Sequence, residues 1–276
     1  MPNELIKFWR KLNLTSQPFA HPDDSEILRQ NGAEFNGTEP GNFETYIGSS
    51  LFGRLKSDDK RLHLSLLPTP YMGDITHAEI VILSSNPGVE HTDYWAENKM
   101  PPFQRRLEGN LQQSFEGVES PFLFLDPEFC WHTGFMYWEE RLREVIRLIA
   151  DKRFDKRYIE GLRDLSRRLA CVELIPYHSV SFVNGLIGRT PSETLPSANK
   201  ALDFARTTLL QDTVEGRRTL VVPRKTEKWG IPAPHEHLVI YPSEQAQTFS
   251  LKPNSPGGKA ILRRYGIDSA ESIERN

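Results

Sequence analysis

Four short apolar runs stand out along the chain, and they predict the strands of a sheet. They cover residues 78–85, 170–177, 218–224 and 237–242, and each is rich in Val, Ile and Leu without regular polar alternation. Continuous apolar runs of this length are typical of strands that are buried on both faces, as in a parallel sheet.

Helical patterns lie between the runs. Residues 138–150 repeat apolar side chains at the i, i+3, i+4, i+7 spacing of an amphipathic helix, namely Leu142, Val145, Ile146 and Ile149. Residues 197–210 predict a second helix with Ser197 as its N-cap. A short helix near the end of the chain is expected to stop at Gly266.

The alternation of strands and helices predicts the fold class. It is the order of an α/β protein, a three-layer α/β/α sandwich with a four-stranded, mostly parallel central sheet. We expect this domain over 71–276 and interpret residues 1–70 as an N-terminal extension packed on it. Residues 89–137 form an aromatic-rich insertion after the first strand, and long loops of this kind are usually functional.

Composition narrows the partners and the compartment. The net charge is −3, so a nucleic-acid partner would need local basic patches instead of an overall basic surface. No apolar run approaches the length of a membrane helix, and the start of the chain lacks a signal-peptide pattern. Two cysteines give no metal-ligand spacing. We therefore expect a cytoplasmic protein without a membrane partner or metal.

Candidate chemistry gathers after the predicted strands, because ligands of open parallel sheets lie beyond the carboxyl ends of the strands. The first strand ends in Ser-Ser-Asn-Pro-Gly at 84–88, where Asn86 could hold a water or could simply cap its own backbone in the turn. After the second strand, His178 could donate to a developing anion or could bond to backbone as a structural residue.

The sequence lacks the motifs of several enzyme classes. The chain has no GxSxG elbow for a serine hydrolase, and neither a P-loop nor a GxGxxG fingerprint for a nucleotide cofactor. We expect no cofactor. Asp126 and Glu128 leave a paired-carboxylate site open, although Asp-Pro is first a turn former.

The strand-end pattern resembles the uracil-DNA glycosylase superfamily, and within it the mismatch-specific uracil/thymine branch. That branch ends its first strand in GINPG, and residues 84–88 keep Asn86, Pro87 and Gly88 but carry Ser84 and Ser85 in place of Gly-Ile. The superfamily's second motif would fall in the loop after the last strand, without its literal HPSPLS or NPSGLS form. The likeness covers roughly residues 70–265, including the pieces FLFLDPEF, MYWEERL and LIPYHS.

The resemblance implies a four-stranded parallel sheet with the first strand central, and cleavage of the N-glycosidic bond of a base flipped out of DNA. Asn86 would orient the attacking water, with His178 as the second catalytic candidate. Side chains expected to line the base pocket are Ser84, Ser85, Pro87, Gly88, Tyr94, Trp95, Phe124 and Tyr177. Side chains expected at the DNA are Ser179, Arg224, Lys228, Ser243, Phe249, Ser250 and Asn254, with Phe249 as a wedge.

Two departures from the family shape the hypotheses. The aspartate that other branches carry is absent, so catalysis would rest on positioning and on stabilising the departing base anion. The large insertion leads us to expect a larger modified pyrimidine as the base. The alternatives are a catalytically weak or inactive module of the same fold that binds a nucleotide or modified base, and a small-molecule hydrolase argued from fold analogy alone.

Overall fold

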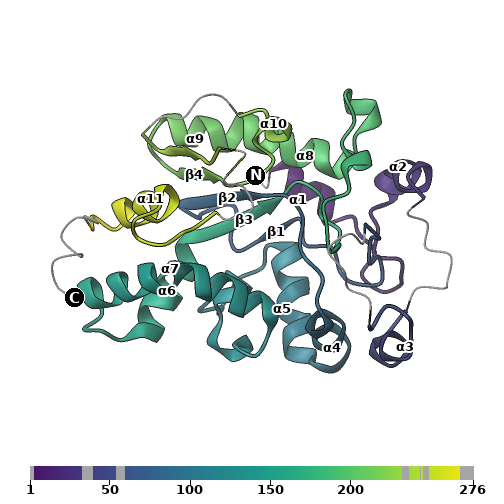
Figure 1. The fold of residues 1–276 in the computed structure, drawn as a ribbon, viewed down its shortest axis with the longest axis horizontal. Helices are drawn as coiled ribbons and strands as arrows, with labels where there is room; N and C mark the ends of the chain where they lie inside the picture. Colours follow the sequence, from purple (N-terminus) through teal and green to yellow (C-terminus); the bar gives the residue numbers. More distant parts are fainter. Residues whose placement is uncertain are drawn as a thin grey trace. The chain divides into compact units, whose positions relative to one another are not determined.

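The computed structural model describes residues 3–32, 40–53, 60–231, 236–242, 244 and 249–267 (Figure 1). The chain divides into two compact units, which are described separately below. Unit 1 comprises residues 1–71, 85–114 and 173–204. Unit 2 comprises residues 72–84, 115–172 and 205–276. The prediction of an extension followed by one domain has no direct test here and stays a prediction.

The protein is of the α/β class, with a five-stranded mixed sheet in the order β1-β3-β2-β4-β5. The strands are β1 (Tyr71–Met72), β2 (Ile80–Ser84), β3 (Leu169–Glu173), β4 (Thr219–Val222) and β5 (Leu238–Ile240). Strand β2 is parallel to β4, with Ile80 opposite Thr219, and β4 is parallel to β5. All four predicted strands are confirmed. The predicted count of four is wrong, because the two-residue strand β1 is too short to leave an apolar pattern.

The core of the sheet explains why the runs lack polar positions. Ile80, Val81, Ile82 and Leu83 of β2 are fully buried, as are the apolar side chains of β4. Side chains of successive strand residues point to opposite faces, so a strand covered on both faces needs an apolar residue at every position.

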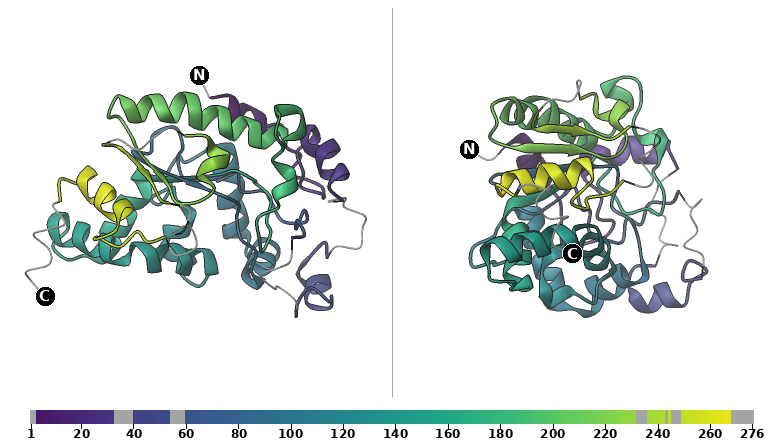
Figure 2. Two further views of the ribbon diagram at one scale, coloured as in Figure 1. Left: turned by 45° about the horizontal axis from the view of Figure 1, so that its top comes forward. Right: turned by 60° about the vertical axis from the view of Figure 1, so that its left-hand side comes forward.

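The helices of unit 2 confirm the amphipathic pattern. The predicted stripe of α6, from Leu142 to Ile149, is fully buried. Helix α11 packs against β4 and β5, and α9 packs against β4 (Figure 2). The helical segments are η2 (Leu123–Leu125), η3 (Pro127–Phe129), α6 (Thr133–Arg153), α7 (Tyr158–Arg168), a π-helical turn (Ala205–Leu209), α9 (Leu210–Val214), α10 (Thr226–Trp229) and α11 (Pro256–Arg264).

Unit 1 is built from short helices and irregular chain. Helix α1 packs against α5 and α8, and its Trp9 is fully buried. The helical segments are α1 (Glu4–Trp9), η1 (Pro22–Asp24), α2 (Ser25–Gln30), α3 (Phe43–Ile47), α4 (His91–Lys99), α5 (Pro101–Gln112), η4 (Asn184–Leu186), η5 (Pro191–Glu193) and α8 (Pro196–Phe204).

The structure also decides two predicted helix ends and the nature of the segment 89–137. Gly266 follows α11 with φ of +64°, the left-handed conformation that glycine adopts most easily, so the predicted stop is confirmed. Ser197 is not an N-cap, because α8 already begins at Pro196 and the Ser197 N–H donates to Asp24 at 2.9 Å. The segment 89–137 is not a bare loop, since it contains α4, α5 and the start of α6.

Candidate functional site at the end of strand β2

The turn that follows β2 is fastened to the segment that follows β3. The main-chain oxygen of Ser85 accepts from the N–H of Ile175 at 3.0 Å, and that of Pro87 accepts from the N–H of Ser179 at 3.3 Å. The two segments therefore stay hydrogen-bonded although neither is in regular strand conformation. Proline and glycine let the chain turn away directly after this ladder.

The carboxamide of Asn86 has a fixed orientation. Its Nδ2 donates to the main-chain oxygen of Ser179 at 3.0 Å, to Oγ of Ser179 at 3.1 Å and to the main-chain oxygen of Pro87 at 3.1 Å. Its Oδ1 accepts from the hydroxyl of Ser85 at 3.2 Å. A carbonyl oxygen has two acceptor positions, so Oδ1 of this half-buried side chain can take a second donor, such as a water.

His178 holds three segments together. Its Nδ1 lies 2.7 Å from the main-chain oxygen of Gly88, and its Nε2 lies 3.1 Å from that of Leu67 and 3.3 Å from Oγ1 of Thr69. A proton on Nδ1 is donated to Gly88, and Nε2 can then accept from the Thr69 hydroxyl. The ring is 5% exposed. This geometry fits the structural alternative for His178, that of a residue that positions the turn, better than direct contact with a substrate.

The structure brings Asn86, Pro87, Gly88, His178 and Ser179 together, as predicted from their places after the first two strands. Ser85 and Ser179 are buried, whereas Gly88 is exposed. Ser179 also donates from Oγ to the main-chain oxygen of Ser181 at 3.0 Å. Its side chain is fully buried and accepts a hydrogen bond from Asn86, and its contact with DNA stays a prediction.

Tyr94 is a core residue and not an open wall of a base pocket. Its ring stacks on that of Tyr46 with centroids 3.8 Å apart, and its hydroxyl lies 2.9 Å from Nδ1 of His63 and 3.2 Å from Oγ of Ser65. It is 1% exposed. Apolar burial decided its place, which an aromatic-rich stretch of sequence does not distinguish from a binding role.

Tyr177 is also in the core. Its hydroxyl donates to Oδ2 of the buried Asp24 at 2.6 Å and accepts from the N–H of His21 at 3.0 Å. Burial raises the pKa of the Asp24 carboxyl above its ordinary value, against the hydrogen bonds from Ser197 and Tyr177. Burial first, and then the charge of Asp24, raises the pKa of Tyr177. The structure thus places Tyr177 in a buried hydrogen-bond network, and its contact with a base stays a prediction.

The remaining pocket candidates lie at partly exposed positions. Trp95 is half-buried on α4 of unit 1, and Ser84 is half-buried at the end of β2. Phe124, in unit 2, stacks on His132 with centroids 5.4 Å apart. Their predicted contact with a base stays a prediction.

In unit 2, the ring of Phe249 lies near the guanidinium groups of Arg141 and Arg224. The guanidinium carbon of Arg224 is 5.1 Å from the centre of its ring, and that of Arg141 is 5.7 Å away. Arg141 also lies 3.6 Å over the ring of Tyr137. Phe249 is 7% exposed because it packs with Tyr241 and the two cations, and its role as a DNA wedge stays a prediction.

Sequence reasoning missed Arg141 and Tyr137. The sequence contains a pattern that indicates their contact, because an aromatic residue followed four positions later by arginine places the two side chains on one helix face. The structure adds Phe249, which lies far away in sequence. Tyr137, Arg141, Arg224 and Phe249 therefore form one cluster of aromatic and cationic side chains in unit 2.

Three of the other residues predicted to contact DNA are described in unit 2. Lys228 lies on α10, and its main-chain oxygen accepts from Arg206 at 3.0 Å. The main-chain oxygen of Ser250 accepts from the Tyr241 hydroxyl. Asn254 is exposed just before α11. Ser243 lies outside the described residues.

The described residues contain no group of three His, Cys, Asp or Glu side chains arranged to hold a metal ion. Within the same part of the chain, no helix combines the length and apolarity needed to cross a bilayer.

Comparison with known proteins gives no relative from which a function can be transferred. No family model, curated protein or solved structure matches the chain significantly.

Proposed function

We propose that the chain is a DNA glycosylase that hydrolyses the N-glycosidic bond of an extruded uracil-like or modified pyrimidine base and leaves an abasic site. The observation that carries the proposal is the fixed carboxamide of Asn86 at the end of β2. Three acceptors hold its nitrogen, so its oxygen can present one lone pair to a water without rotating.

The strand order supports the same proposal. Without β1, the order β3-β2-β4-β5 places the first of the long strands between its neighbours, and β2, β4 and β5 are parallel. This is the central position that the resemblance implies for the strand that ends in the Asn-Pro-Gly turn. In doubly wound sheets, the strand at which the order reverses carries the ligand site. We propose the three-layer α/β/α sandwich as the finer architecture.

In the proposed mechanism, Oδ1 of Asn86 aligns a water for attack on the sugar carbon that bears the base. The bond to the base nitrogen breaks with its electron pair on the base, the water oxygen becomes the hydroxyl of the abasic sugar, and the proton that this water gives up passes to the solvent or to the departing base. No carboxylate follows β2 before Glu90, so the chain would depend on positioning and on stabilising the departing anion. His178 would act through the turn, by holding Gly88 in place.

The DNA partner is part of the proposal. Arg224 and Arg141 carry the guanidinium groups that such a role needs in unit 2, and Phe249 holds both of them. Guanidinium groups bind phosphate oxygens in paired geometry. We also propose the cytoplasm as the compartment.

The test is base release by the full chain and by Asn86→Ala. Duplex and single-stranded oligonucleotides that carry uracil, mismatched thymine or enlarged pyrimidines are incubated with the protein, and alkali then cleaves at abasic sites. The wild type should release one class of base, and Asn86→Ala should lose about 100-fold or more of the rate, in the range of a positioned catalytic group. Asn184→Ala, which alters an exposed asparagine of the same unit, is the matched control.

The second candidate is a binding module of the same fold. The lack of a carboxylate between β2 and Glu90 favours it, because no general base directly follows the strand to activate a water. Tight binding of modified-base DNA by the wild type without abasic sites would establish this alternative. Turnover that is unchanged in Asn86→Ala would instead remove Asn86 from the mechanism.

A further inference from the structure

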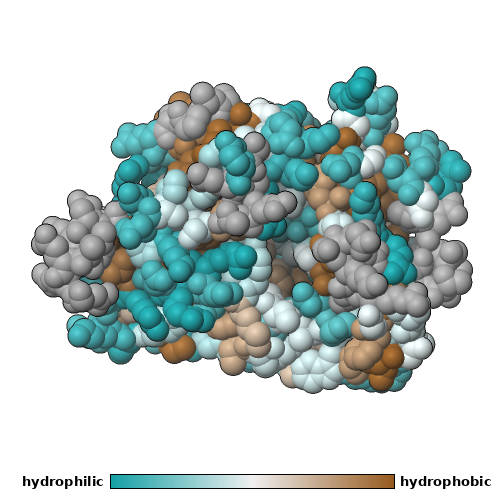
Figure 3. All heavy atoms as spheres, viewed as in Figure 1, coloured by the Kyte–Doolittle hydropathy of each residue, from teal (hydrophilic) through white to brown (hydrophobic). Residues whose placement is uncertain are grey.

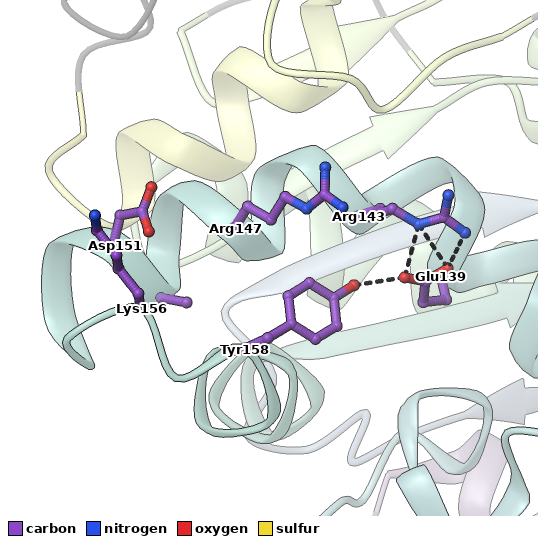
Figure 4. A pocket seen from close by; sticks show the side chains of 7 residues that line it. Glu139, Arg143, Arg147, Asp151, Lys156 and Tyr158 are labelled. Atoms are coloured by element: carbon purple, nitrogen blue, oxygen red, sulfur yellow. Dashed lines mark hydrogen bonds and ion pairs between the residues drawn. The ribbon is translucent and has the colours of Figure 1, made fainter. Parts of the chain in front are cut away.

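A second site lies away from the β2 turn, in a cavity of unit 2 between α6 and α7 (Figure 4). Its volume is about 320 Å³, within the range of small-ligand pockets. The surface over these two helices is predominantly hydrophilic (Figure 3). The lining residues are Glu139, Arg143, Arg147, Ala150, Asp151, Lys156 and Tyr158.

One end of the cavity is neutralised internally. Glu139 accepts from Nε of Arg143 at 2.9 Å and from its Nη2 at 2.6 Å, and it accepts from the Tyr158 hydroxyl at 2.6 Å. The hydrogen bonds and charge of Arg143 lower the pKa of Glu139. Burial and the bond to Glu139 raise the pKa of Tyr158, so its phenol stays neutral. The carboxylate of Glu139 thus orients the side chains of Arg143 and Tyr158 through these hydrogen bonds.

The middle of the cavity carries cations that are in no close ion pair within the described part of the chain. Arg147 lies between Arg143 and Asp151 along α6, with Tyr158 facing this row from α7 (Figure 4). Among the described residues, neither Arg147 nor Lys156 has a carboxylate within 4.0 Å, the limit for an ion pair. Asp151, at the same end as Lys156, is likewise not in such a pair. Beyond the Arg143–Glu139 pair, one guanidinium group and one ammonium group therefore share this cavity with one carboxylate, that of Asp151.

The backbone that presents Lys156 is strained. Asp155 and Lys156 connect α6 to α7 with φ of +48° and +66°. Two consecutive left-handed residues without glycine are costly, and strain of this kind clusters at functional sites. The turn brings Lys156 back to α6, where its N–H donates to the main-chain oxygen of Ala150 at 3.1 Å.

We propose that this cavity binds a phosphate group, with Arg147 and Lys156 as its principal contacts and the free edge of Arg143 as a third donor. Phosphate suits the site because its oxygens accept from several cationic donors at once, whereas a single carboxylate would leave donors unused. Asp151 favours a phosphate that is flanked by a donor group, such as a sugar hydroxyl. The group can belong to a mononucleotide or to a DNA strand, and the inference stands apart from the proposed base release.

The test measures three probes by calorimetry at low salt: inorganic pyrophosphate, a deoxynucleoside 5′-monophosphate and a short single-stranded oligonucleotide. The wild type should bind at least one of them. Arg147→Ala should weaken that binding about tenfold, the effect of losing one charge-assisted hydrogen bond at an exposed site. Lys152→Ala removes the same charge from an exposed position of α6 outside the cavity, and it should leave the affinity within about twofold.

Lys156→Gly separates binding from folding. Glycine relaxes a positive φ, so this variant should be at least as stable as the wild type. It should still bind the phosphate probe several-fold more weakly. If Lys156→Gly weakens the binding of the two small probes, the ligand is a free nucleotide. If it weakens the binding of the oligonucleotide alone, the ligand is a DNA strand. Either result supports the site.

Two results would overturn the proposal. One is no binding of any probe by the wild type, and the other is an equal loss in Lys152→Ala and Arg147→Ala, which would show only general charge attraction. Base release in the Asn86→Ala experiment does not enter this comparison, so failure of the proposed function is read separately.

Discussion

Ser179→Ala offers the sharpest check on how the Asn86 carboxamide is held. The substitution deletes an Oγ that accepts from Nδ2 of Asn86 at 3.1 Å and donates to the main-chain oxygen of Ser181 at 3.0 Å. The Ser179 side chain is fully buried, so no water replaces these bonds at once. The main-chain oxygens of Ser179 and Pro87 remain for the two protons of Nδ2.

The magnitude follows from this count of partners. Two net hydrogen bonds at about 0.5–1.5 kcal/mol each give a loss of about 1–3 kcal/mol in the free energy of unfolding. No buried donor of Asn86 is left without a partner, so the larger penalty for an orphaned polar group does not apply. Oδ1 also keeps its direction, and we expect base release to fall only several-fold.

The assay is urea unfolding of the wild type, Ser179→Ala, Asn86→Ala and the double variant. Because the two residues are in contact, their effects should be non-additive by about 0.5–1 kcal/mol. Base release is measured on the same four proteins. Additive unfolding energies, or a Ser179→Ala protein as inactive as Asn86→Ala, would refute this account of how Asn86 is positioned.

Three further predictions concern buried groups and backbone. Burial raises the pKa of Glu97 above 4.5 in the folded protein, so the folded state binds this proton more tightly than the unfolded state does. The stability that the protonated carboxyl contributes is therefore lost as the pH rises from about 4.5 through the folded pKa. Glu97→Gln can keep the bond from the Leu67 N–H, and its free energy of unfolding should gain on that of the wild type as the pH rises; a constant difference would contradict this. Tyr177→Phe leaves Asp24 without its 2.6 Å donor, and thermal unfolding should show a loss of about 2–4 kcal/mol, whereas a neutral effect would contradict the network. Gly73→Ala, at φ of +84°, places a Cβ 2.5 Å from the main-chain oxygen of Leu169, and chemical unfolding should show a loss of more than about 2 kcal/mol; Gly266→Ala, in open space, should cost about half as much or less.

Much of the candidate site followed from chain position. The first apolar run ends within one residue of Ser84, the last residue of β2, whereas the second ends at residue 177, four residues beyond the end of β3 at Glu173. Parallel neighbouring strands bring their carboxyl ends to one edge, which is why residues about 90 positions apart could be predicted to meet. The hydrogen bonds between Asn86 and Ser179 bear out this reasoning.

The aromatic residues show the limit of the same reasoning. The resemblance to the uracil-DNA glycosylase superfamily implied base or DNA contacts for Tyr94, Tyr177 and Phe249. All three are buried, with rings or hydroxyls engaged by Tyr46, Asp24 and Arg224 respectively. An aromatic side chain carries both a large apolar surface and a recognition function, and one sequence does not distinguish them.

By itself, the sequence determined the periodic elements: the four long strands, the apolar stripe of α6 and the stop at Gly266. These depend on local spacing, on burial of whole strands and on the backbone freedom of glycine, which are written in neighbouring residues. Tertiary structure decided everything that joins distant segments. It fixed the carboxamide of Asn86, committed both nitrogens of His178 to the protein, and gathered Arg147 and Lys156 around one cavity, because such contacts depend on three-dimensional packing that no local pattern encodes.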